Sequence, residues 1–379
     1  MLKTVEATLM LSGMIIGVGM FAIPYSFASA GFWLGATELV ILAGVVTLLH
    51  LLYGRLVMAT PASHRLPGYI TLYLGSRAGA VAWFSALFGI SGTLLAYVLL
   101  GSQFLSSILS PILGNGGATS FAIVIVGVGS LITLYPLKKG ALINGILTAV
   151  LVVFIVTLAA ALMPHVETAN LEGFDPSRAF VPYGVLLFAL SGAVVIPDVI
   201  AIINRDRRKA VRVIILGTLV PALIYGLFAV AIVGVFGRAV APDTISGLGR
   251  FGGGIVVLGG IIGFLAVFTS YLALNSSFQE LLRLDWGLSR SLSWVMGGFI
   301  PLALYLLGFQ NFILVISVVG AISIGIDSLL LVLSYHRLKK QEAGAASIRP
   351  VAYLWKAAFM LLIGAGIAQT LYQVLAGGA

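Results

Sequence analysis

The feature that most constrains this sequence is a long stretch without any charged residue. Between Arg77 and Lys138 the chain contains no Asp, Glu, Lys or Arg. A transmembrane helix needs about 20 consecutive apolar residues, so this stretch alone has room for two crossings of a membrane. Across the whole chain only 9% of the residues are charged, compared with about 25% in soluble domains. Because the alternation typical of membrane β-barrels is absent, we predict an all-α polytopic membrane protein embedded in the lipid bilayer.

Apolar runs bounded by charged residues, Pro or Gly predict eleven spans in a single domain, residues 1–379. They are expected near residues 5–30, 33–57, 78–109, 119–137, 140–163, 180–202, 211–236, 252–282, 291–308, 310–335 and 353–375. The longer loops are expected at 58–77, 164–179, 237–251 and 336–352. The first apolar run is longer than the apolar core of a signal peptide, so we expect a retained first helix.

The distribution of Lys and Arg predicts how the chain is oriented. If the N-terminus is cytoplasmic, all but three of the 21 Lys and Arg residues fall on the cytoplasmic side, the three being Arg178, Arg238 and Arg250. Cytoplasmic loops collect these residues, so we expect a cytoplasmic N-terminus and, with eleven spans, an extracytoplasmic C-terminus in the inner (plasma) membrane. The net charge of +9 is then a topology signal, and no nucleic-acid partner is expected. No feature of the sequence indicates an oligomeric state.

Two predicted helices carry Gly and Pro at matching places. Gly19 precedes Pro24 by five residues, Gly192 precedes Pro197 by five, and the two pairs lie 173 residues apart. Gly weakens a helix and Pro removes a backbone donor. A lone Gly-x-Gly would be explained by close helix packing. A matched pair of interrupted spans, however, indicates the binding site of a secondary transporter.

The spacing of these interruptions also predicts an internal repeat. Five helices lie from the first interrupted helix up to the second, and an odd number of spans per repeat inverts the second copy. We therefore expect one repeat at about 5–163, a second at about 180–335, and an extra helix at about 353–375.

Two segments resemble a known family. Residues 13–35, GMIIGVGMFAIPYSFASAGFWLG, resemble the first helix of the amino acid–polyamine–organocation superfamily. Residues 269–290, TSYLALNSSFQELLRLDWGLSR, resemble its amino-acid permease branch, which includes bacterial aromatic amino-acid and serine permeases. The resemblance implies the LeuT fold, a five-plus-five inverted repeat with discontinuous helices 1 and 6, here with an eleventh helix. It implies alternating-access import of a neutral amino acid, aromatic or otherwise hydrophobic, by cation symport.

The resemblance also places the substrate at the two interruptions. Backbone N–H groups at the start of a half-helix suit the substrate carboxylate, and carbonyls that end the preceding half-helix suit its ammonium group. Phe188 would cover the substrate and Ser191 would line the pocket, while Tyr97 would contribute a hydroxyl. Ordinary packing of Phe188 and a bond from Tyr97 to a neighbouring carbonyl are the alternatives. The expected substrate-binding residues are Ile15, Ile16, Gly17, Val18, Gly19, Tyr97, Phe188, Ala189 and Ser191.

A coupling ion is expected beside this site. In sodium-coupled members of the fold, sodium lies between helices 8 and 1, which here corresponds to Ala266, Thr269 and Ser270 with the carbonyls of Gly13 and Ile16. Five oxygen atoms lie near the lower limit for a hard cation. The alternative is that Thr269 and Ser270 bond back to carbonyls one turn earlier, as hydroxyls in membrane helices often do. We expect sodium as the coupling ion and no other cofactor.

Proton coupling remains the alternative. Proton-coupled relatives carry a Lys inside helix 5, whereas Lys138 and Lys139 lie only at its expected cytoplasmic mouth. Carboxylates inside a membrane are functional candidates, and Glu38, Asp198 and Asp327 lie in or near spans without any ranking among them. Asp198 could pair at a cytoplasmic gate.

Other functional classes find little support. No repeated filter motif indicates a channel, although a channel or a non-transporting membrane sensor is an alternative. The chain has no Cys and no HExxH or GxSxG motif, so we do not expect an enzyme. The four His residues are expected near helix ends or in loops: His50, His64, His165 and His336.

Overall fold

A computed structural model describes residues 2–62, 64–113, 117–135, 140–284, 286–343, 360–361 and 363–372. Within these residues the regular structure is helical throughout, which confirms the all-α prediction. The α-helices are α1 (Leu2–Ile15), α2 (Ile23–Ala30), α3 (Phe32–Ala59), α4 (Leu66–Leu74), α5 (Ser76–Leu113), α6 (Ala118–Thr133), α7 (Gly140–Leu162), α8 (Val181–Leu190), α9 (Ile196–Ile202), α10 (Arg207–Phe236), α11 (Gly253–Leu284), α12 (Arg290–Leu306), α13 (Phe312–Val318) and α14 (Gly325–Ala343). The shorter 3₁₀ and π segments are η1 (Val18–Ala22), η2 (Met163–His165), η3 (Thr168–Leu171), η4 (Pro176–Arg178), η5 (Ala193–Val195), η6 (Gly237–Ala239), η7 (Ser246–Phe251) and the π-helix η8 (Val319–Ile324).

The helices are those of a multi-pass membrane protein. Seven helical segments of the described chain are long and apolar enough to cross a bilayer, and the bent pair of α1 with residues 18–30 raises this to as many as eight. α6 and α12 occur where spans four and nine are predicted but contain 16 and 17 residues. At a rise of 1.5 Å per residue they are roughly 24–26 Å long, somewhat short of a bilayer core of about 30 Å. Of the last predicted span, 360–361 and 363–372 are helical, and the rest lies outside the described residues.

Two predicted boundaries are wrong for identifiable reasons. The expected loop 58–77 contains the short helix α4, which begins with a Pro in its first turn and ends at Gly75 with φ +91°. α14 continues to Ala343, beyond the expected end at residue 335. Its last turns are polar, and a helix that leaves the membrane continues in water without any apolar signal.

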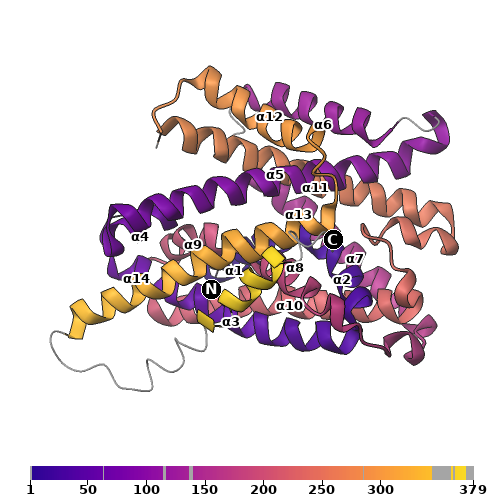
Figure 1. Ribbon diagram of the computed structural model, residues 1–379, viewed down its shortest axis with the longest axis horizontal. Coiled ribbons are helices and arrows are strands. Elements are labelled where there is room, and N and C mark those ends of the chain that lie inside the picture. The colour runs from indigo at the N-terminus through magenta and orange to yellow at the C-terminus, as the bar shows by residue number, and fades with distance from the viewer. Residues whose placement is uncertain are drawn as a thin grey trace.

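The bundle places the interrupted helices between two pairs of long helices. α5 and α11 pack along each other through the middle, with α6 and α12 along one side and α3 and α10 along the other (Figure 1). α1 packs against α10 and α9, while α2 and η1 pack against α8. Large apolar side chains on the outside of the bundle, such as Val40, Leu131 and Leu223, are exposed, as expected for helices that face lipid.

Candidate substrate and ion site at the helix breaks

The first helix is interrupted at Ile16 and Gly17. α1 ends at Ile15, these two residues are not helical, and η1 begins at Val18. Gly17 is extended, with φ −146° and ψ −152°, and no side chain of the described residues caps the following turn. The two parts of the helix are bent by 47° relative to each other. The predicted discontinuity of this helix is confirmed.

The sixth predicted helix is interrupted in the same way. α8 ends at Leu190, Ser191 and Gly192 are not helical, and η5 follows. α9 then begins at Ile196, 173 residues after the Ile23 that begins α2. The Gly and Pro pattern therefore located both interruptions correctly.

Tyr225 on α10 joins the helix ends that precede the two breaks. Its hydroxyl lies 2.7 Å from the Ile15 carbonyl oxygen and 3.1 Å from that of Ala189, and its side chain is fully buried. One phenol proton is shared between these two carbonyls, each of which keeps a lone pair for a further donor. Ile15 and Ala189, two of the residues expected to bind the substrate, are thus brought together at Tyr225. Sequence reasoning missed Tyr225 because its partners are 210 and 36 residues away along the chain.

His50 accepts a hydrogen bond from the backbone of the second break. The Gly192 N–H donates to His50 Nε2 at 3.2 Å, and His50 Nδ1 lies 3.0 Å from the Thr218 hydroxyl. A backbone N–H only donates, so Nε2 is the acceptor, and the neutral ring carries its proton on Nδ1 and donates it to Thr218. The expectation that every His lies near a helix end or in a loop is wrong for His50, which is buried inside α3. A run of apolar residues does not reveal a polar residue that faces the interior.

A small cavity, too narrow to admit a water molecule, lies where the first break meets α7 and α11. It is lined by Ile16, Gly17, Val18, Phe21, Thr148, Leu151, Ala266, Val267 and Ser270. Three residues of the predicted sodium set line it, namely Ile16, Ala266 and Ser270, together with the predicted substrate residues Gly17 and Val18. The structure adds Thr148 from α7, which the sequence did not single out.

Gly13 and Thr269 relate to this cavity differently from the other predicted sodium residues. A Cβ on Gly13 would lie 4.0 Å from Thr148 Cγ2, so α1 approaches α7 closely there. The Thr269 hydroxyl donates to the carbonyls of Leu265 at 2.9 Å and Ala266 at 3.2 Å. Thr269 therefore makes the bond to the preceding turn that was the alternative to ion binding.

Tyr97 connects the predicted substrate residues with the predicted ion residues. Its hydroxyl would lie 3.9 Å from a Cβ placed on Gly17, and it forms a side-chain hydrogen bond with Ser270. Tyr97 is buried, so a polar partner for its hydroxyl is required. That partner is a side chain on α11. From the sequence, we considered only the substrate and a neighbouring carbonyl.

Gly19 and Phe188 form a packed contact. A Cβ on Gly19 would lie 2.9 Å from the Ala189 Cα and from Phe188 Cδ1. Gly19 thus permits η1 and α8 to touch, which corresponds to the packing alternative. Phe188 is half-buried, and its carbonyl accepts a bond of 3.2 Å from the N–H of half-buried Ser191.

We call the end of the bundle that carries Lys3, Arg65 and Arg205 the basic end. There Arg65 Nη1 lies 2.8 Å from Asp198 Oδ2 and 3.1 Å from the Val194 carbonyl oxygen. Arg205 donates to the Pro61 carbonyl at 3.3 Å. Asp198 therefore pairs with Arg65, and its suggested role in a gate stays a prediction.

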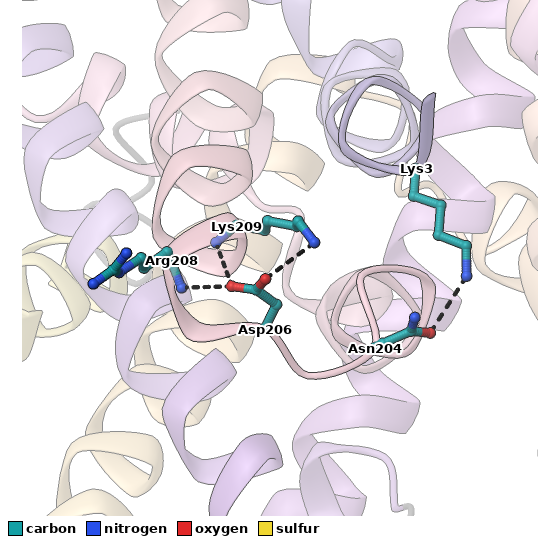
Figure 2. A network of polar contacts seen from close by, with 5 residues as sticks. All are labelled: Lys3, Asn204, Asp206, Arg208 and Lys209. Atoms are coloured by element: carbon teal, nitrogen blue, oxygen red, sulfur yellow. Dashed lines mark hydrogen bonds and ion pairs between the residues drawn. The ribbon is translucent and has the colours of Figure 1, made fainter. Parts of the chain in front are cut away.

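A second set of contacts lies at the same end. Lys3 reaches the Asn204 side chain at 3.4 Å, and Asp206 accepts the N–H groups of Arg208 and Lys209 at the start of α10 (Figure 2). Hydrogen bonds from the Lys209 backbone and side chain lower the pKa of Asp206. These contacts join the start of α1 and the turn before α10.

The opposite end, which we call the vestibule end, contains a cavity of about 470 Å³. Its lining residues come from α2, α5, η4, α8, α13, nearby loops and the helical residues 363–372: Tyr25, Ser29, Gln103, Ser177, Arg178, Val181, Pro242, Gln310, Asn311, Phe312, Ile313, Leu314, Ser317 and Thr370. None of the residues at the two breaks is among them.

Of the three candidate carboxylates, Asp327 and Glu38 lie inside the bundle. Asp327 on α14 forms a side-chain hydrogen bond with Ser85 on α5, while its Oδ1 is buried and has no partner within the described chain. Glu38 on α3 also has a buried oxygen, Oε2, without a partner there. In the part of the chain that the structure describes, no cluster of three or more His, Cys, Asp or Glu side chains could hold a metal ion.

These features define a multi-pass membrane protein in which two interrupted helices meet at a buried polar cluster. Residues 2–368 match the tryptophan/tyrosine permease family. The chain belongs to this family. Because it is a family of permeases, the expectation that the protein is not an enzyme is confirmed.

A more specific relative covers only part of the chain. Tyrosine-specific transport system 1 of Haemophilus influenzae is 24% identical over 179 residues, which is 47% of this chain and 44% of that protein. The match thus spans less than half of the length of this relative. Both comparisons agree with the aromatic amino-acid permeases that the sequence resembles.

Proposed function

We propose that this protein carries an aromatic amino acid across the membrane by alternating access around the two helix breaks. The observation that carries the proposal is the meeting of both interruptions at Tyr225, in a chain of the tryptophan/tyrosine permease family. Backbone groups freed in mid-membrane are tolerated where they face a cavity or a polar ligand. An amino acid supplies both a carboxylate for the N–H groups and an ammonium group for the carbonyls.

The fold we propose is the LeuT-type five-plus-five inverted repeat, followed by an eleventh helix. Helix contacts occur in pairs that exchange the two halves of the chain. α10 packs against α1 as α3 packs against α8, and α11 packs against α7 as α5 packs against α13 and η8. Likewise α12 contacts α5 as α6 contacts α11. Such reciprocal contacts are expected if residues 5–163 and 180–335 are two copies of one unit.

We propose that the substrate carboxylate lies at the N–H groups of Gly17, Val18 and Gly19. Gly17 is the position most open to a ligand, since a Cβ there would meet only the Tyr97 hydroxyl, at 3.9 Å. The ammonium group would face the carbonyls beside Tyr225, at Ile15 and Ala189. The site reads the backbone of the amino acid without using a charged side chain.

Sodium is the coupling ion that we propose, bound at the small cavity between α1, α7 and α11. The carbonyls of Ile16 and Ala266 and the hydroxyl of Ser270 would supply oxygen ligands, which hard cations prefer. The Gly13 carbonyl and the Thr269 hydroxyl would complete the set, because a hydroxyl that donates its proton to a carbonyl keeps lone pairs that can face a cation. An ion there would tie α1 to α11 and, through Ser270 and Tyr97, favour substrate binding by reciprocal linkage.

Uptake of radiolabelled tyrosine and tryptophan into proteoliposomes tests this function. We expect saturable accumulation driven by an inward sodium gradient. Ser270→Ala should weaken the sodium dependence more than Thr269→Ala, because the Thr269 hydroxyl already bonds within its own helix. Passive equilibration would instead indicate a channel, and no uptake would reject the transporter proposal.

Proton coupling is the second candidate, favoured by the buried oxygens of Asp327 and Glu38 that lack partners in the described chain. Ionisable groups inside a membrane often form proton relays. Uptake that ignores sodium and stops when the proton gradient is dissipated would select this candidate. Asp327→Asn and Glu38→Gln would then identify the residue that binds the proton.

A further inference from the structure

The start of α10, at the basic end, carries several cations with little negative charge to balance them. Arg207, Arg208, Lys209 and Arg212 lie within the first six residues of this helix, and all four are exposed. Asp206 caps the helix and pairs with Lys209 at 3.0 Å. Within the described chain, Arg207, Arg208 and Arg212 form no ion pair within 4.0 Å.

This placement of cations is unfavourable for the helix by itself. The start of a helix is the positive end of its dipole, where cations are disfavoured. Arg208 and Arg212 are also four residues apart, and like charges at this spacing on a helix repel each other. An anion bound beside these two side chains would offset both effects.

Arg208 and Arg212 lie on the face of α10 that points away from the protein. Residues four apart share one face of a helix. A different face of α10 packs on α1, where a Cβ on Gly217 would lie 2.7 Å from Leu11. Figure 2 shows the Arg208 side chain directed away from Asp206. The two guanidinium groups are therefore open to a ligand from outside the bundle.

The same face of α10 continues as exposed apolar surface. Leu216, Leu219 and Leu223, which we call the leucine stripe, are 46%, 38% and 74% exposed. They follow Arg212 at the three- and four-residue spacing of one helix face. Leu223 lies eleven residues after Arg212, roughly 16 Å along the helix at 1.5 Å per residue. That is about half of a bilayer core of about 30 Å, so the stripe has the length of one leaflet.

Charge and apolar surface in this order favour one kind of ligand. A free anion would use the arginines but not the leucine stripe, and a lipid without net charge would use the stripe but not balance the arginines. The tendency of Lys and Arg to collect on one side of a membrane explains the number of cations here. It does not explain why two of them directly precede the stripe on one face.

We propose that Arg208 and Arg212 bind the phosphate of an anionic phospholipid whose acyl chain lies along the leucine stripe. Guanidinium groups bind phosphate oxygens through paired hydrogen bonds, and anionic lipids attract basic residues that flank a membrane helix. The lipid belongs to the leaflet at the basic end. Its binding requires neither the proposed substrate site nor the proposed ion site.

The test follows the thermal unfolding midpoint of the full chain in detergent while lipid is added, because a ligand of the folded state raises this midpoint. Phosphatidylglycerol is the anionic probe. Phosphatidylcholine has the same acyl chains without net charge, and glycerol phosphate has the anionic group without acyl chains. We expect only phosphatidylglycerol to raise the midpoint. An equal shift with glycerol phosphate would replace the lipid by a free anion, and an equal shift with phosphatidylcholine would show that charge is not recognised. Either result would overturn the proposal.

Variants locate the site on α10. Arg208→Gln with Arg212→Gln should weaken the apparent affinity for phosphatidylglycerol about thirtyfold, and each single substitution about fivefold, as expected for basic residues at an anionic surface. The matched control, Arg178→Gln with Arg238→Gln, removes two exposed arginines outside α10 and should keep the wild-type affinity.

Two further comparisons separate lipid binding from folding. Each variant is referred to its own midpoint in phosphatidylcholine, so a loss of intrinsic stability does not enter the affinity. Arg208→Lys with Arg212→Lys keeps both charges and should retain most of the affinity. Wild-type affinity in the Arg208 and Arg212 glutamine variants, or an equal loss in the control, would overturn the site.

Discussion

The segments that follow the two helix breaks are held in place by different chemistry. The Phe21 carbonyl in η1 accepts a bond of 2.6 Å from the buried hydroxyl of Thr244. The Val194 carbonyl in η5 accepts a bond of 3.1 Å from Arg65, whose side chain is 56% exposed. Phe21 and Val194 are 173 residues apart, the same offset that relates the two Gly–Pro pairs. The hydrogen bond from Thr244 to η1 is buried and uncharged, whereas the hydrogen bond from Arg65 to η5 is exposed and made by a charged group.

This difference indicates which end of the bundle is released more easily. Water and salt compete with an exposed ion pair, whereas a buried hydrogen bond has no replacement when it is broken. Thr244 also holds an unfavourable backbone for a β-branched residue, with φ +61°, which persists only where surrounding contacts fix it. We infer that η1 is the fixed member of the pair and that η5 with α9 is the member that moves.

The largest expected effect concerns Tyr225, which both breaks share. Tyr225→Phe keeps the ring and removes the hydroxyl that bonds Ile15 and Ala189, so two buried carbonyls lose a partner. We expect the free energy of unfolding to fall by about 3 kcal/mol, measured by thermal or denaturant unfolding in detergent. Unchanged stability would mean that the two breaks are not held together through α10.

Gly19 inside η1 and Gly192 directly before η5 should differ in a related way. A Cβ on Gly19 would meet the Ala189 Cα at 2.9 Å, whereas a Cβ on Gly192 would meet side-chain atoms of Leu11 and Ile15 at 2.7–2.8 Å. Side chains can rotate, but a backbone atom moves only with its helix. We therefore expect Gly19→Ala to cost about 2 kcal/mol of stability and Gly192→Ala to cost less. The reverse order in thermal unfolding would contradict this account.

The same contrast explains what the sequence could and could not predict. Gly and Pro act on the backbone of their own segment, so both interruptions were located from their spacing alone. The length of an apolar run likewise located ten helical segments in the part of the chain described between residues 2 and 343. Tyr225, His50 and Thr244 act through partners that are distant in sequence, and none of them lies in a motif. Only the fold brings such partners together.

The predicted ion residues show the limit within one motif. Ala266 and Ser270 line the small cavity, but Thr269 turns its hydroxyl to carbonyls of α11. A hydroxyl in a helix has two favourable partners, the preceding turn and a neighbouring helix. The spacing of the residues does not determine which partner the hydroxyl takes, because that depends on the side chains of the neighbouring helices. Thr148 was missed for the same reason.

A moderate effect is expected at the buried hold on η1. Thr244→Val keeps the shape and the branched Cβ of the residue and removes only the hydroxyl that bonds Phe21. We expect a loss of about 1 kcal/mol in the free energy of unfolding, with no dependence on ionic strength because the pair carries no charge. A loss that changes with added salt would show that the hold on η1 is not the uncharged bond described here.

The smallest effect on stability, and the most informative one on transport, is expected at Arg65. Arg65→Gln removes the ion pair between Arg65 and Asp198, in which the two side chains are 56% and 42% exposed. We therefore expect the free energy of unfolding to fall by less than about 1 kcal/mol. High salt should reduce even that cost, because screening weakens the pair in the wild type as well.

If α9 is the segment that moves, losing this pair should favour the state that is open at the basic end, and single-Cys probes placed on α9 should become more reactive. Thr244→Val provides the control, since it should not increase that reactivity. Equal reactivity in wild type and Arg65→Gln would show that the Arg65–Asp198 pair does not keep the basic end closed. The contacts of η1 and η5 would then differ in burial but not in their effect on opening.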